Sequence, residues 1–213
     1  MKILALADET CKALYDFYSP GKLAEYDLIL ACGDLRAEYL SFIVTMARCP
    51  VFYVHGNHDA GYEMKPPLGC DCVEDKIVVY KGLRVLGLGG SFRYRPGEHQ
   101  YTEKEMAKRI RKLRWKLRKS KGVDIVITHA PAAGLGDMDD PAHKGFACFL
   151  GLMEQYHPRY LVHGHVHPNY DQAVQREHIY GDTKVINAFE RYTFEIPDDT
   201  ILPCKWKGDL PYV

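Results

Sequence analysis

Side chains that can bind metal ions follow five short apolar runs of this sequence. The runs are followed by Asp8, by Gly33-Asp34, by Gly56-Asn57-His58-Asp59, by His129 and by Gly164-His165-Val166-His167. Carboxylates, amide oxygens and neutral imidazoles are ligands for Mn²⁺, Fe or Zn²⁺ rather than for a soft thiolate site. One shared carboxylate can hold two such ions about 3.5–4 Å apart, where they suit a phosphate oxyanion and acidify a bridging water.

Each of these sets stands at the end of a predicted strand. The strands, which read as buried on both faces, are Lys2–Ala7, Asp27–Cys32, Val51–His55, Asp124–Thr128 and Tyr160–His163. Because the carboxyl ends of strands in α/β sheets open onto the crevice where ligands bind, we expect the five sets to converge on one pocket. A glycine precedes the polar residue in three of the sets and permits a sharp turn out of the sheet.

Helices and hairpins are predicted around these strands. We expect helices at Leu35–Ala47 and Phe146–Tyr156, a hairpin of Ile77–Tyr80 with Arg84–Leu88, a second pair of Lys184–Asn187 with Thr193–Ile196, and loops at Met64–Cys72 and Arg93–Gln100. The alternation predicts an α/β fold in which helices are layered over largely buried sheets.

The segment Glu103–Lys121 concentrates positive charge in a chain of zero net charge. It holds ten Lys or Arg and two Glu, whereas the whole chain has 28 basic and 28 acidic residues. Met106, Ile110, Leu113 and Leu117 recur in it at spacings of four, three and four, which is typical of an amphipathic helix. Its polar face is either solvated or attracts a polyanionic substrate or an acidic partner, and the helix could also join two copies in a homodimer.

Length and composition favour one globular domain, residues 1–213, of which 46% are apolar. No apolar run reaches the roughly 20 residues of a membrane span, and the apolar start is interrupted too early for a signal peptide. Seven cysteines at scattered spacings favour a reduced, cytoplasmic protein. The pair in Cys70-Asp71-Cys72 lacks a second pair for a zinc site. Sequence-specific nucleic-acid binding is not expected, because no zinc-finger or base-stacking signature is present.

Taken in order, the five motifs resemble those of the calcineurin-like metallophosphoesterases. The pattern of that family runs Asp-x-His, Gly-Asp, Gly-Asn-His-(Asp/Glu), His and Gly-His-x-His, and the match here extends from Asp8 to His167. The resemblance implies a four-layer αββα sandwich with the site at one edge. It also implies a metal-dependent phosphoesterase acting on a phosphate-ester substrate.

The resemblance assigns two divalent metal ions, Mn, Fe or Zn, to the matching positions of the motifs. Asp34 would bridge the two ions. The other ligands would be Asn57, His129 and His165 for one ion, and Asp8 and His167 for the other.

The resemblance also gives roles in catalysis. A metal-bound hydroxide would attack phosphorus, with His58 as general acid or charge stabiliser and Asp59 orienting its ring. A proton donor at His58 suits the poor leaving group of a phosphodiester, so we favour diesters over monoesters. Arg36 and His143 stand near the expected mouth of the site. Each could contact substrate oxygens or face solvent.

The first motif departs from the family pattern, because Asp8-Glu9-Thr10 has Thr10 where a histidine is expected. The second metal site could be weaker but filled, with water, Glu9 or Cys11 completing it. It could instead prefer a hard ion such as Mn²⁺ or Mg²⁺, or the protein could bind one metal and be slow. We expect the weaker site to fill. The alternative function is a catalytically weak or inactive scaffold on the same fold.

Overall fold

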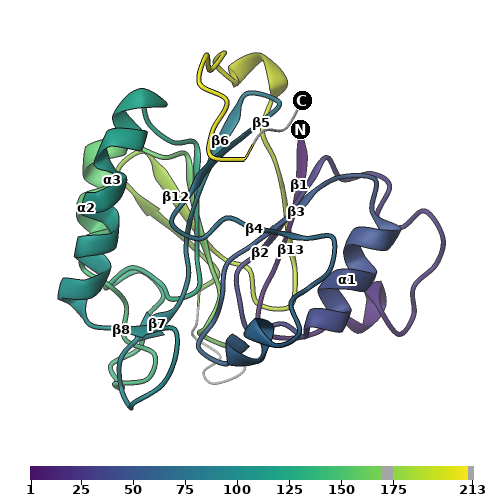
Figure 1. The fold of residues 1–213 in the computed structure, drawn as a ribbon, viewed down its shortest axis with the longest axis horizontal. Helices are drawn as coiled ribbons and strands as arrows, with labels where there is room; N and C mark the ends of the chain where they lie inside the picture. The colour runs from purple at the N-terminus through teal and green to yellow at the C-terminus, as the bar shows by residue number, and fades with distance from the viewer. Residues whose placement is uncertain (169–174, 211–213) are drawn as a thin grey trace.

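Two β-sheets lie face to face in the computed structural model, which describes residues 1–168 and 175–210 (Figure 1). Within these residues one sheet has five strands in the order β13-β1-β2-β3-β4. Its strands are β1 (Lys2–Leu6), β2 (Leu28–Ala31), β3 (Val51–Tyr53), β4 (Asp71–Cys72) and β13 (Tyr192–Glu195). The first three end one or two residues before the predicted strands did.

The second sheet of the described chain has six strands in the order β11-β12-β10-β9-β6-β5. Its strands are β5 (Ile77–Tyr80), β6 (Leu83–Leu88), β9 (Ile125–Thr128), β10 (Tyr160–His163), β11 (Glu177–Tyr180) and β12 (Thr183–Asn187). A small pair, β7 (Ser91–Phe92) and β8 (Gln100–Tyr101), stands apart from it. The predicted hairpin is confirmed, because β5 and β6 pair antiparallel.

Helices cover the outer face of each sheet, as Figure 1 shows. α1 (Ala37–Met46) packs on the five-stranded sheet, and α2 (Glu103–Lys119) and α3 (Cys148–Tyr156) pack on the six-stranded sheet. Short 3₁₀ helices lie at Lys12–Leu14, Asp59–Glu63 and Asp198–Thr200. In the described part of the chain, no helix combines the length and apolarity needed to cross a bilayer.

The alternation of side chains along the strands produces the four layers. Ile3 of β1 faces the core between the sheets, whereas Leu4 faces the core under α1. Ile125 of β9 likewise enters the core between the sheets, and Val126 enters the core under α2 and α3. Because successive residues of a strand point to opposite faces, a run of consecutive apolar residues fills two cores at once. The predicted αββα sandwich is confirmed.

The second predicted pair is wrong in its partners. Lys184–Asn187 lies in β12, which pairs with β10 and β11, whereas β13 pairs antiparallel with β1 in the other sheet. The chain therefore crosses between the sheets just after Asn187. Local alternation gives each strand its buried face, but it does not say which sheet the next strand joins.

Parallel pairing brings the predicted ligands to one edge. β1, β2 and β3 run parallel, and so do β6, β9, β10 and β12. The carboxyl ends of parallel strands lie at the same edge of a sheet, so the loops after β1, β2, β3, β9 and β10 can meet there. An amide-to-carbonyl bond from Asp8 to Gly33 (3.1 Å) and one from Gly164 to His129 (3.0 Å) tie these loops together.

Candidate metal centre

Three predicted ligands have a left-handed backbone. The φ angles are 66° at Asp8, 55° at Asp34 and 69° at His165. This conformation costs a non-glycine residue about 1–2 kcal/mol, and such strain persists only where the surrounding structure holds it. Three strained residues at one edge are expected where the backbone is bent to aim side chains at a common point.

Two motif glycines are required by the close approach of carboxylates. A Cβ atom on Gly56 would lie 2.0 Å from Asp34 Oδ1, and one on Gly164 would lie 2.6 Å from Asp8 Oδ2. Any other residue would therefore displace a predicted ligand. The two glycines, which have no side chains, leave the space that the carboxylates occupy.

The centre of the candidate metal site is formed by Asp34, His129 and His165. One potential ligand atom from each lies within 4.8 Å of the others. His129 is fully buried and its Nδ1 lies 2.8 Å from the carbonyl oxygen of Cys32, so Nδ1 carries the hydrogen in the neutral ring. Its Nε2 then presents a lone pair, 3.2 Å from Asp34 Oδ2 and 3.1 Å from Asn57 Oδ1.

This arrangement fits a divalent cation. Three lone-pair donors, Asp34, Asn57 and His129, face one another, and such groups repel unless a proton or a cation lies between them. In the metal-free chain, burial lowers the pKa of His129, but the negative charge of Asp34 and the hydrogen bond to it raise the pKa to about 9. For Asp34, burial raises the pKa, but His129 outweighs this and holds the pKa below its usual range. Positive charge is therefore favoured between these groups, and either a proton or a cation can supply it.

His165 is prepared as a neutral ligand. Its Nε2 lies 2.7 Å from the carbonyl oxygen of Ala142, so Nε2 donates and Nδ1 keeps a free lone pair. Burial, aided by the charge of His129, lowers the pKa of His165 to about 3. The ring therefore stays uncharged at neutral pH, as metal ligation requires.

Asp8 and His167, the ligands predicted for the second ion, also lie close to each other. His167 Nε2 lies 3.7 Å from Asp8 Oδ1, so the structure brings these two predicted ligands together. Both oxygens of Asp8 also accept the backbone N–H of His165, at 2.9 and 3.0 Å. Among the described residues, neither Asp8 nor His167 belongs to a group of three acidic, histidine or cysteine ligands.

His58 is exposed beside the centre, and its backbone N–H donates to Asp34 Oδ1 at 2.8 Å. We expected Asp59 to orient the His58 ring, but the structure gives it other partners. Asp59 Oδ2 accepts the backbone N–H groups of Asp34 (2.8 Å) and Gly56 (2.7 Å). Burial and the charge of Asp34 raise the pKa of Asp59 to about 6, against these hydrogen bonds. Asp59 therefore fixes two loops relative to each other.

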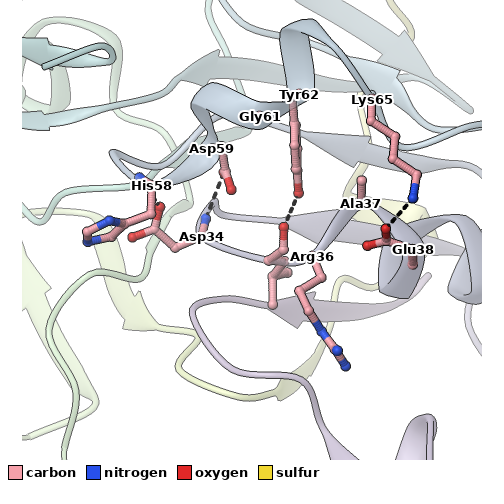
Figure 2. Close-up of a pocket in the computed structure, with 10 residues that line it drawn as sticks. Asp34, Arg36, Ala37, Glu38, His58, Asp59, Gly61, Tyr62 and Lys65 are labelled. Atoms are coloured by element: carbon pink, nitrogen blue, oxygen red, sulfur yellow. Dashed lines mark hydrogen bonds and ion pairs between the residues drawn. The ribbon is translucent and has the colours of Figure 1, made fainter.

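A pocket of about 360 Å³ opens beside Asp34 and His58 (Figure 2). It is lined by Asp34, Leu35, Arg36, Ala37, Glu38, His58, Asp59, Gly61, Tyr62 and Lys65. The Arg36 guanidinium lies 5.7 Å from the ring centroid of Tyr15, and Lys65 pairs with Glu38 at 2.6 Å. Arg36 thus lines the pocket, as a substrate contact would.

His143, the other predicted substrate contact, lies on the His165 side of the centre. Its ring centroid is 5.3 Å from that of His165, and its Nδ1 is 2.9 Å from Asp140 Oδ2. The sequence did not point to Lys65 and Tyr62 as pocket residues, although Lys65 lies in the loop predicted at Met64–Cys72. The sequence also gave no sign that the carbonyl of Ala142 would contact a predicted ligand, because every residue has a carbonyl.

A second ligand-like cluster lies nearby, formed by His55, Glu74 and His99. His55 Nδ1 is 2.5 Å from Glu74 Oε2, and Arg109 Nη2 is 2.7 Å from Glu74 Oε1. Burial lowers the pKa of His55, but hydrogen bonds to Cys72 and Glu74 outweigh it and raise the pKa to about 10. Two cations therefore already neutralise Glu74. His163, at the end of β10, is fully buried, with its Nδ1 2.9 Å from the carbonyl of Gly164.

The fold and the centre together define a two-sheet sandwich with a candidate metal site at the carboxyl ends of its strands. The family model of the calcineurin-like phosphoesterases matches residues 2–169, and the chain belongs to that family. Membership of this family supports the function of a metal-dependent phosphoesterase at the level of the superfamily. Comparison with curated protein sequences gives no significant match.

Solved structures show the same fold at low sequence identity. The crystal structure of TT1561 from Thermus thermophilus matches with a TM-score of 0.58 and 18% identity over 89% of both chains. A proposed 5′-nucleotidase from Staphylococcus aureus, solved with α-ketoglutarate, has a TM-score of 0.56 and 14% identity, over 96% of this chain and 52% of that one. GAP50, the anchor in the inner membrane complex of Plasmodium, matches with a TM-score of 0.52 and 12% identity, over 88% of this chain and 70% of that one.

Proposed function

We propose that this chain hydrolyses phosphate esters, with a preference for diesters, using two divalent cations. The observation that carries the proposal is the set of facing lone pairs at Asp34, Asn57 and His129, with the free Nδ1 of His165 beside them. A structural histidine would be satisfied by hydrogen bonds. These side chains have instead an arrangement that only a proton or a cation stabilises.

The side chains divide into two ligand sets that share Asp34. Asn57, His129 and His165 would hold one cation with it, and Asp8 and His167 would hold the other. The cations would be Mn, Fe or Zn, which supply Lewis acidity and lower the pKa of bound water. Cys32 and Ala142 fix the two histidine tautomers through their carbonyl oxygens.

The remaining residues act on the substrate. His58 lines the pocket with its backbone fixed to Asp34, so its imidazole can donate a proton to the leaving-group oxygen. That donor supports diester hydrolysis, in which the leaving group is poor. Arg36 in the pocket and His143 beside His165 would contact substrate oxygens. We also propose that residues 1–213 form one domain, because the described strands contribute to shared cores.

The test is hydrolysis of bis-nitrophenyl phosphate with and without added Mn²⁺, together with metal analysis of the purified protein. Asp34→Asn should abolish the metal-dependent rate and lower the metal content. Asp16→Asn, an exposed carboxylate outside the centre, should change neither. We expect a second equivalent of metal at millimolar Mn²⁺. One equivalent that added Mn²⁺ does not change would exclude the dinuclear site.

The second candidate function is an inactive scaffold, which the substitution at Thr10 favours. Full metal binding with no hydrolysis of any phosphate ester in a broad panel would support the scaffold and reject the enzyme.

A further inference from the structure

The solvent face of α2 carries a continuous stripe of cations around an exposed tryptophan. The outer stripe consists of Lys104, Lys108, Arg111, Trp115 and Arg118, at spacings of four, three, four and three. These spacings place its members on one face of the helix, and all of them are exposed. Lys112, Arg114 and Lys119 flank the stripe and are also exposed.

The structure shows no acidic partners for the cations of this face among the residues that it describes. Within residues 1–168 and 175–210, none of the basic residues of the outer stripe or its flanks forms an ion pair. In contrast, Arg109 pairs with Glu74 and Asp75, and Lys116 pairs with Asp209, on the side of α2 that faces the rest of the protein. The chain has as many acidic as basic residues, yet it leaves this face uncompensated. Such a face attracts polyanions.

Trp115 adds a contact that charge alone does not provide. Its side chain is 66% exposed in the middle of the cations. Lys119 Nζ lies 4.8 Å from the ring, and no other ring or cation contacts it in the part of the chain that the structure describes. Beside the stripe is a hollow of about 320 Å³ lined in part by Arg114, Arg118 and Tyr156.

The geometry of this face favours one kind of partner over the others. A membrane surface would need an apolar helix face, but Met106, Leu113 and Leu117 are buried in the core under α2. A second copy of this face would bring like charges together. A single-stranded nucleic acid instead offers phosphates for the cations and unpaired bases that stack on an exposed indole.

We propose that the outer stripe of α2 binds single-stranded nucleic acid without sequence preference. A helix of this length spans about 25 Å, which matches a contact of several nucleotides. The binding does not depend on phosphate-ester hydrolysis, and it is compatible with the absence of a sequence-reading motif. It would keep a phosphodiester polymer on the surface of the protein.

The experiment is fluorescence anisotropy of a labelled oligodeoxythymidine of about 16 nucleotides, measured over a series of salt concentrations. Arg111→Gln with Arg118→Gln should weaken binding about tenfold and make the slope of log K against log salt about 1.4 less negative, since each lost phosphate contact contributes about 0.7. Lys12→Gln with Arg48→Gln removes two exposed cations that form no ion pair within the described residues, and it should change neither quantity. Trp115→Ala should weaken binding about tenfold at every salt concentration, with the slope unchanged, and Trp115→Phe should restore part of it.

Several outcomes would overturn the proposal. One is that the oligonucleotide does not bind at physiological salt. Another is that the α2 double variant and the control double variant lose affinity equally. A third is that Trp115→Ala binds the oligonucleotide as tightly as the wild type. Equally tight binding of polyglutamate, of duplex DNA or of anionic vesicles would also reject a single-stranded ligand. All of these variants keep the metal ligands, so hydrolysis of bis-nitrophenyl phosphate should stay at the wild-type rate.

Discussion

Replacing Gly56 by alanine is expected to disable the metal centre while the chain stays folded. The new Cβ would lie 2.0 Å from Asp34 Oδ1 and 2.6 Å from the Asp34 backbone nitrogen, and ordinary contact begins at 3.4 Å. The Asp34 backbone must therefore shift, and the carboxylate must withdraw by about 1.4 Å. Asp34 now accepts the His58 N–H at 2.8 Å and lies 3.2 Å from His129 Nε2. A withdrawal of that size would break both contacts.

The size of the effect follows from the displacement. A misplacement of about 1 Å at a reacting centre costs about 100-fold in rate, so the loss for Gly56→Ala should be at least that large. The strain of overpacking is about 1–3 kcal/mol, which is less than the total stability of a typical domain, about 5–15 kcal/mol. The variant should therefore melt at a lower temperature but remain folded at 25 °C.

The assay combines turnover of bis-nitrophenyl phosphate at saturating Mn²⁺, metal content and thermal melting. Gly151→Ala is the control, because Gly151 lies in α3, outside the lining of the pocket, and a Cβ there would meet nothing within 4 Å. Normal metal content and normal turnover in Gly56→Ala would refute the argument that Asp34 is held against Gly56. Loss of activity in both variants would indicate a general sensitivity of the fold to an added methyl group.

Further predictions address the metal ligands, the proton donor and the ion-pair network. Thr10→His should tighten the second equivalent of Mn²⁺ at least about tenfold in calorimetric titration, and an unchanged affinity would contradict the assignment of the weak site. His58→Ala should slow alkyl diesters by about 10²–10⁴-fold and nitrophenyl diesters much less, with constant metal content; equal losses would argue against a general acid. Because the folded pKa of His55 is raised from 6.5 to about 10, its contribution to stability is complete below pH 6.5 and is lost as the pH rises to 10. Glu74→Gln should flatten this decline, which is at most about 1.4 kcal/mol per pH unit, in urea unfolding at several pH values; the same decline in both proteins would assign it to other groups.

The sequence by itself determined the ligand types and the buried strands. A carboxylate, an amide and imidazoles at Asp34, Asn57, His129 and His165 are chemistry that residue identity carries. Consecutive apolar residues in runs such as 2–7 define strands with two buried faces, and the spacing of Met106, Leu113 and Leu117 defines the buried side of α2. These features are local, so an amino-acid string is enough to state them.

The tertiary structure alone decided which groups meet. It placed β13 beside β1 rather than beside β12, and it turned Asp59 toward the backbone of Asp34 and Gly56 rather than toward His58. Strand order depends on the packing of whole sheets, which no local pattern encodes. The carbonyl groups that fix the histidine tautomers are present in every residue, so only their position in space distinguishes them from the rest.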